Sequence, residues 1–141
     1  MAFNPLVKKI EKARWRVAAF TPQRMGEIGR AAARSVVERI YSGRDVADAP
    51  ARPLSPRYAR RKQARGRRNL RDMTFTGMTL ASIHVLSATN NRCVIGAASA
   101  PEARKLALAH WRGNQFGMSP KNMDDFAKAV RSKLIVEAAN V

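Results

Sequence analysis

The feature that most constrains this chain is a run of twenty residues, Arg52 to Arg71, with nine Lys or Arg and no acidic residue. From Arg60 to Arg71 the run has no hydrophobic periodicity, so most of it cannot enter a core. Like charges at this density repel one another, and we expect a mobile loop except where a partner orders it. We call residues 51–72 the basic arm. Its cations are Arg52, Arg57, Arg60, Arg61, Lys62, Arg65, Arg67, Arg68 and Arg71.

The charge of the whole chain is divided unevenly around this arm. The 141 residues carry a net charge of +17, of which residues 1–71 hold 19 basic and 5 acidic groups. Such an imbalance favours an acidic partner for the first half, either nucleic acid, a membrane surface or an acidic protein. No apolar run approaches the roughly 18 residues of a membrane span, and we expect no membrane partner. The alternative is that the cations merely solvate helix faces.

Groups that could carry catalysis or bind a metal are sparse. The two histidines, His84 and His110, lack the spacing from other ligand types that metal sites require. Asp124 and Asp125 are adjacent, so their side chains point about 100° apart on a helix and make a poor acid–base pair. The single Cys93 is interpreted as a small core residue. We therefore expect a protein that is not an enzyme and has no metal or cofactor.

The N-terminal region, residues 1–50, is expected to be helical. Asn4-Pro5 and Thr21-Pro22 each place a capping residue before a proline, which is typical of a helix start. The second pair predicts a helix to about Tyr41, ended by Gly43. Two glycines either weaken its first turns or mark a close helix contact, namely Gly26 and Gly29. Its expected buried face is Met25, Ile28, Ala32, Val36 and Ile40.

Residues 73–141 are expected to form an α+β body. A helical turn with Leu80 and Ile83 on one face precedes two strands, 84–88 and 92–97, which a turn at Thr89-Asn90-Asn91 joins into a hairpin. A helix from Pro101 to about Trp111 should follow, closed by Gly113.

The last helix is expected to begin at Ser119-Pro120. Its apolar stripe is Met123, Phe126, Ala127, Val130, Leu134 and Ile135. The predicted fold class is therefore α+β, in one domain. Two N-terminal helices lead to the basic arm, whose short helix begins at Ser55-Pro56, and then to a β-hairpin and two C-terminal helices around a small sheet.

Short motifs occur in a defined order between Pro53 and Val130. They are Pro53-Leu54-Ser55, the basic Arg60, Arg61 and Lys62, Leu70, Thr76-Gly77-Met78-Thr79-Leu80-Ala81-Ser82-Ile83, Val94-Ile95-Gly96, Ala107, Ala109 and His110 with Gly113, and Phe116-Gly117-Met118-Ser119. In this order they resemble the virion morphogenesis or tail-completion (head–tail joining) proteins of tailed bacteriophages. The segment between Gly113 and Phe116 is shorter than in that family.

This resemblance implies a structural protein of the virion neck or tail, assembled in the cytoplasm of the bacterial host. It would form a ring, a hexamer or a dodecamer, that completes the tail or joins head to tail beside neck, portal-adaptor or tail-tube proteins. The basic arm would then dock on an acidic neighbouring ring or face packaged DNA. The family-like structural positions are Pro53, Leu54, Ser55, Thr76, Gly77, Leu80, Ser82, Ile83, Ile95, Gly96, His110, Gly113, Phe116 and Gly117.

The alternative function is sequence-independent DNA binding by the basic arm. Its cations could neutralise several phosphates and give an affinity that falls with salt. Tyr58 is the arm's only aromatic residue, which disfavours base stacking on single strands. No helix-turn-helix or zinc-finger spacing is present, so reading of a DNA sequence is not expected.

Overall fold

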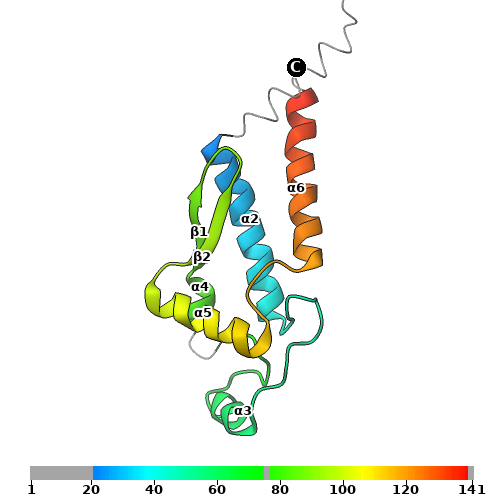
Figure 1. Cartoon of the computed structure of the whole chain (residues 1–141). Helices are drawn as coiled ribbons and strands as arrows, with labels where there is room; N and C mark the ends of the chain where they lie inside the picture. The colour runs from blue at the N-terminus through cyan, green and yellow to red at the C-terminus, as the bar shows by residue number, and fades with distance from the viewer. Residues whose placement is uncertain (1–20, 75–76, 140–141) are drawn as a thin grey trace, which may run out of the picture.

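The protein is described by a computed structural model that covers residues 21–74 and 77–139, the last seven by their backbone only. It has the expected mixed α+β fold, with a helix, short helices, one antiparallel hairpin and two C-terminal helices (Figure 1). The helix predicted from Asn4-Pro5 lies outside the described residues. In chain order the elements are α2 (Pro22–Tyr41), α3 (Pro56–Gln63), α4 (Met78–Ala81), β1 (Ile83–Ala88), β2 (Cys93–Ala97), α5 (Ala100–Gly113) and α6 (Pro120–Ala139).

Helix α2 is the central element, and its predicted start and end are confirmed. Thr21 caps it by accepting a hydrogen bond from the backbone N–H of Arg24 at 3.2 Å. Ser42 is the C-cap, and Gly43 follows with a φ of +74°, as the terminating glycine of a helix does. The predicted buried face is also confirmed, since none of its five residues is more than 8% exposed.

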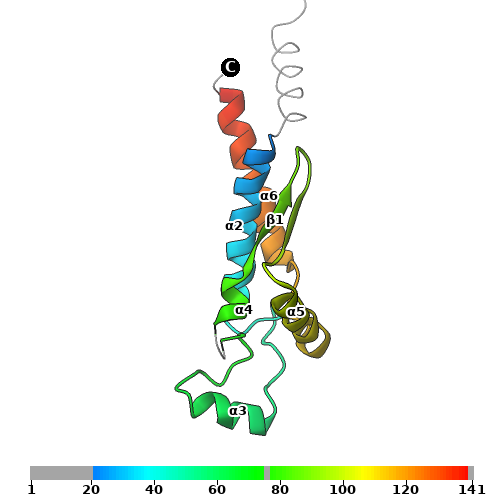
Figure 2. The ribbon, with the colours of Figure 1, turned by 90° about the vertical axis from the view of Figure 1, so that its left-hand side faces the viewer.

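The hairpin covers one side of α2 and α6 runs antiparallel along another (Figures 1 and 2). Between them lie two apolar clusters. The second half of α2 packs against α4, the start of β1 and α5, through Ile40, Leu80, Ile83 and Leu106 among others. The first half, with Met25 and Ile28, packs against the hairpin end and α6.

The apolar stripe predicted for α6 is partly buried where its side chains are described, and the side chains of Leu134 and Ile135 lie outside that part. Phe126 and Val130 are partly buried against α2, but Met123 is 54% exposed, so its predicted place in the stripe was wrong. At its level α6 meets α2 through a polar contact instead, in which the Arg39 Nε–H donates to Asn122 Oδ1 at 2.9 Å. None of the helices in the described part of the chain is long and apolar enough to cross a membrane.

The hairpin approaches α2 closely. Strands β1 and β2 pair in an antiparallel register with Ile83 opposite Ala97, and a bulge follows Val85. A Cβ on Gly29 would lie 2.9 Å from Val85 Cγ2 and 3.0 Å from Cys93 Sγ, whereas one on Gly26 would meet nothing closer than 3.7 Å. Gly29 therefore marks a close contact, and its partner is the hairpin.

Helix α5 crosses the base of the body (Figure 1). It is tied to α4 by the Thr79 hydroxyl, which donates to Glu102 Oε2 at 2.6 Å. The prediction that Gly113 closes α5 was wrong. Gly113 is the last helical residue, and the left-handed C-cap is Asn114 with a φ of +49°. The glycine serves another purpose, because the side chain of Arg71 passes over it.

Candidate interaction surface: the basic arm and its pocket

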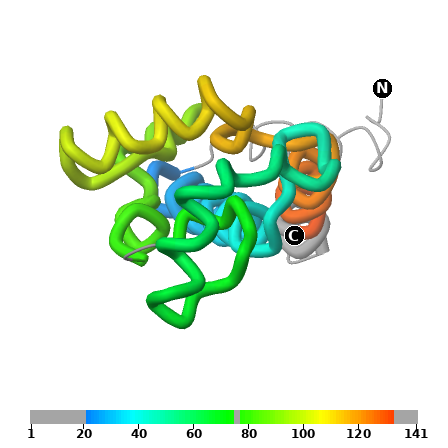
Figure 3. The backbone as a smooth tube through the Cα atoms, turned by 90° about the horizontal axis from the view of Figure 1, so that it is seen from below, coloured from blue at the N-terminus to red at the C-terminus, as the bar shows by residue number. Residues whose placement is uncertain are grey.

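The basic arm is a folded segment at the end of the molecule opposite the hairpin tip (Figures 2 and 3). Its short helix α3 begins after Ser55 as predicted, with Pro56 in the first turn. One face of α3 is buried through Ala59 and Lys62, the latter only 1% exposed. The expectation of a mobile arm was therefore wrong for this part, because an apolar period is not the only way to anchor a helix.

The anchor is a buried ion pair. Lys62 Nζ donates to a carboxylate oxygen of Asp72 and to the carbonyl of Leu70. The other Asp72 oxygen accepts from Arg68 at 3.0 Å, and Arg68 also lies 4.1 Å above the centre of the Tyr41 ring. Asp72 is 0% exposed. One carboxylate thus bonds two cations of the arm, and one of these, Arg68, also contacts Tyr41 at the end of α2.

Hydrogen bonds control the charge state of this carboxylate. Burial alone would raise the pKa of Asp72, but hydrogen bonds from Lys62 and from the Thr74 hydroxyl and N–H, together with the Lys62 charge, outweigh it. The pKa of Asp72 is therefore held below its ordinary value, and the group stays ionised at neutral pH.

Arg71 closes the arm into a loop. Its Nε–H donates to the carbonyl of Arg52 at 2.8 Å and its Nη2 donates to that of Pro53 at 3.1 Å. A Cβ on Gly113 would lie 2.7 Å from Arg71 Cδ, so the glycine gives this side chain its path across α5. The two ends of the arm are thus held side by side.

A buried polar network joins the arm to the rest of the body. Gln115, 1% exposed, donates its side-chain N–H to the carbonyl of Arg71. The Gln115 carbonyl in turn accepts from Arg39 at 2.8 Å, and Arg39 also bonds Asn122 on α6. This network connects the arm, α2 and α6, so the arm is positioned by the whole fold.

The other six cations of the arm remain exposed, and three of them lie on the outer face of α3. The buried carboxylate of the arm, Asp72, pairs with Lys62 and Arg68. The outer face of the arm therefore carries concentrated positive charge. The six are Arg52, Arg57, Arg60, Arg61, Arg65 and Arg67.

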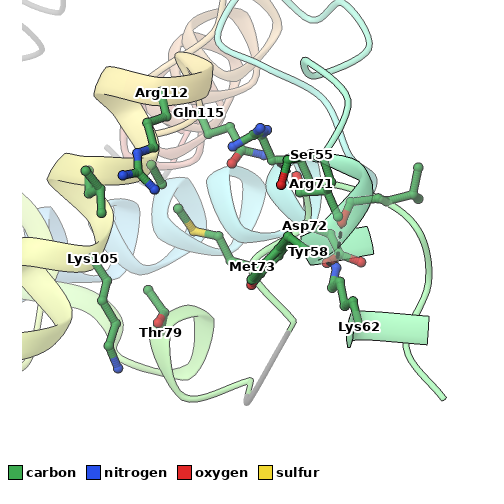
Figure 4. A pocket seen from close by; sticks show the side chains of 14 residues that line it. Ser55, Tyr58, Lys62, Arg71, Asp72, Met73, Thr79, Lys105, Arg112 and Gln115 are labelled. Carbon is green, nitrogen blue, oxygen red and sulfur yellow. Dashed lines mark hydrogen bonds and ion pairs between the residues drawn. The ribbon is translucent and has the colours of Figure 1, made fainter. Parts of the chain in front are cut away.

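A pocket of about 550 Å³ separates the arm from α5 and α4 (Figure 4). Figure 4 shows Arg112 reaching from α5 on one side and Tyr58 and Asp72 of the arm on the other, with Met73 between them. Leu108 adds to the α5 wall and is 44% exposed. The pocket therefore combines apolar walls with cationic groups at its edge.

Two arginines, Arg71 and Arg112, line this edge, and Arg52 lies close enough to act on Arg71. Burial lowers the pKa of Arg71, and the neighbouring charges of Arg52 and Arg112 lower it further. Like charges held this close favour an anion between or beside them. Lys105 also lines the pocket, but its ammonium is paired with Glu102 at 2.6 Å.

The family-like positions lie mainly in the core, at turns and at the ends of helices and strands. Leu80 and Ile83 are core residues, and Phe116 packs partly buried against them. Gly77 and Gly117 have positive φ angles at the start of α4 and before α6. Pro53, Leu54 and Ser55 lead into α3, and Leu54 lines the pocket. Ser82, Ile95 and Gly96 belong to the hairpin region, and His110 and Gly113 are on α5. Thr76 lies outside the described residues.

Residues for which the sequence predicted no role at this surface complete it. Trp111, one helical turn from Leu108 on α5, is 80% exposed, and Leu70 at the pocket is 40% exposed. Asp72 and Gln115 hold the arm in place. One signal was available for Asp72, since it is the first acidic residue after nine cations.

The titratable residues considered for catalysis do not converge. His84 Nδ1 lies 2.7 Å from the carbonyl of Ser82, and Asp124 pairs with Lys128 at 2.7 Å on the exposed face of α6. Within the described ranges, no three His, Cys, Asp or Glu side chains are placed to hold a metal ion. Comparison with protein-family models, curated proteins and solved structures found no match for this chain.

Proposed function

We propose that this chain is a structural subunit of a tailed-phage virion, a neck or tail protein that forms a ring and either completes the tail or joins it to the head. The ordered motifs from Pro53 to Ser119 support this role. Their residues lie at turns, caps and core contacts, as expected of positions that maintain a shape.

The observation that carries the proposal is the face between α5 and the arm. Large apolar side chains remain exposed there beside a folded surface of exposed arginines. Tyr58, Leu70 and Leu108 line the pocket there and are 37% to 44% exposed, and Trp111, one helical turn from Leu108 on α5, is 80% exposed. A cluster of this kind is typical of a protein–protein contact, and identical subunits with head-to-tail contacts close into rings.

Electron microscopy tests the role directly. Purified protein should show closed rings, and labelled protein should be found at the neck or tail tip of virions from the phage that encodes it. A protein that is monomeric in solution and absent from particles would overturn the proposal.

The second candidate function is sequence-independent DNA binding, which the three outward arginines of α3 favour. A triple change of Arg57, Arg60 and Arg61 to Gln should then lower the slope of log affinity against log salt by about 3. The control removes three exposed arginines elsewhere, Arg30, Arg34 and Arg104. DNA binding that is weak at low salt, or equally reduced by both triple variants, would reject binding through the arm.

A further inference from the structure

The pocket between the arm and α5 is large enough to hold a side chain from another protein segment. Its volume, about 550 Å³, lies within the roughly 300–1,000 Å³ of typical ligand sites. Leu54, Leu70, Leu108 and Met73 make its aliphatic walls. Two of these, Leu70 and Leu108, are 40% and 44% exposed, so a guest that covers them removes apolar surface from water.

The arginines at the edge of the pocket favour a bound segment that carries negative charge. Arg71 and Arg112 line it, with Arg52 close enough to repel Arg71. The only acidic lining residue is Asp72, whose oxygens are held by Lys62 and Arg68. No carboxylate among the lining residues is therefore available to neutralise the edge, and a guest that supplies one complements it.

We propose that this pocket receives a large apolar side chain from an acidic protein segment, whose flanking carboxylates bind Arg71 and Arg112. The proposal rests on the proposed function for its setting, in which the segment belongs to a neighbouring subunit. The proposal specifies the partner segment, in which a Leu, Phe or Trp side chain lies between Asp or Glu residues. It also specifies that this side chain enters the pocket between the arm and α5.

A protein segment fits the pocket better than a nucleic acid does. Bases are held by stacking on aromatic rings and by polar partners for their edges. Tyr58 is the only aromatic lining residue, and the opposite wall is aliphatic. A phosphate backbone would satisfy the arginines but leave the aliphatic walls exposed to water.

The test measures binding of fluorescein-labelled peptides by anisotropy. The probe is an eight-residue peptide of Asp and Glu with a central Trp. Its comparison peptides have Ala in place of Trp, or Lys in place of the acids, and a labelled 20-base-pair DNA duplex is measured alongside. The acidic Trp peptide should bind at least tenfold more tightly than either altered peptide.

Variants of the pocket then locate the binding. Arg112→Glu reverses a charge at the edge and should weaken the Trp peptide at least tenfold, whereas Arg104→Glu makes the same change elsewhere on α5 and should leave binding within twofold. Ala109→Trp fills the pocket and should abolish binding. Leu108→Ala should weaken it severalfold, with Leu86→Ala on the hairpin as its matched control. Circular dichroism confirms that each variant is folded.

Two results would overturn the inference: equal binding of the Trp and Ala peptides, or equal losses from Arg112→Glu and Arg104→Glu. DNA binding that disappears in Ala109→Trp would assign the pocket to nucleic acid instead. The mass of the same sample separates this inference from the proposed function. In an assembled ring a neighbouring subunit would already occupy the pocket, so Ala109→Trp should then also disrupt the ring. A ring that persists in Ala109→Trp and does not bind the acidic Trp peptide rejects the pocket proposal alone, and a monomer that binds the peptide rejects the ring alone.

Discussion

Asp72 holds the buried face of α3 in place. Its carboxylate is fully buried and bonds one buried cation, Lys62, and one exposed cation, Arg68. An ion pair removed from water contributes little against an apolar pair of the same shape, but loss of one partner leaves the other charge buried and unpaired. The packing of α3 against the rest of the arm therefore depends on this carboxylate.

Asp72→Ala is expected to lower the free energy of unfolding by about 3–5 kcal/mol, or to release the arm locally so that Lys62 reaches water. Chemical denaturation measures the first outcome, and hydrogen exchange of residues 55–72 measures the second. Asp124→Ala, which breaks an exposed pair with Lys128, is the matched control and should change little. Adding Lys62→Met to Asp72→Ala should recover stability. If Asp72→Ala behaves like the control, Asp72 does not anchor the arm.

The lowered pKa of Asp72 predicts a pH window. A carboxylate whose pKa is lower in the folded state stabilises fully above its unfolded value, about 3.9, and loses that contribution as the pH falls through the folded value. The difference in unfolding free energy between wild type and Asp72→Asn should stay constant from pH 7 to about 4 and shrink below that. A difference that already declines between pH 7 and 5 would contradict the assigned contacts.

At the scale of elements, α2 organises the body because the hairpin and α6 both pack on it. Its contact with the hairpin is close at Gly29 and looser at Gly26. These two glycines lie one turn apart on the same helix, so replacing either by alanine should give the same gain in helix propensity. The space around their Cα atoms differs, because only Gly29 is close to the hairpin.

Gly29→Ala is expected to destabilise the protein by about 1–3 kcal/mol, because the new methyl group would overlap Val85 and Cys93. Gly26→Ala should stabilise it by up to about 1 kcal/mol through helix propensity, since its nearest contacts are of ordinary length. Thermal and urea unfolding of both variants check this. Equal effects of the two changes would show that the hairpin does not approach α2 as described.

The elements themselves could be predicted from the sequence because local signals define them. Thr21-Pro22, the apolar period of α2 and the Asn90-Asn91 turn act over a few residues. The anchoring of the arm could not be predicted, because Lys62 meets Asp72 through geometry that no apolar period records. The role of Gly113 was missed for the same reason, since the side chain that needs its space comes from 42 positions earlier.

On the scale of the whole molecule, α3 of the arm and α5 lie toward the same end (Figure 2). The pocket is lined by residues of both. The sequence placed the positive charge there but not the apolar side chains that accompany it. Trp111 and Leu108 lie one helical turn apart on α5 and are both exposed. The residues that line the pocket come from distant segments of the chain, so only the fold brings those segments together.

Trp111→Ala is expected to leave the free energy of unfolding of the monomer almost unchanged, because this side chain is 80% exposed. It should reduce assembly, since an aromatic side chain at the centre of a contact carries much of the binding energy. Leu86→Ala, at an exposed leucine of the hairpin, is the control for assembly. Sedimentation of both variants measures assembly. If the two variants assemble equally, α5 does not take part in the contact between subunits.

The mass of the purified, untagged protein in native mass spectrometry tests the ring most directly. A closed ring predicts a single species at six or twelve times the 15.6 kDa of one chain, stable over a range of protein concentrations. A species of 15.6 kDa at every concentration and salt would contradict the account.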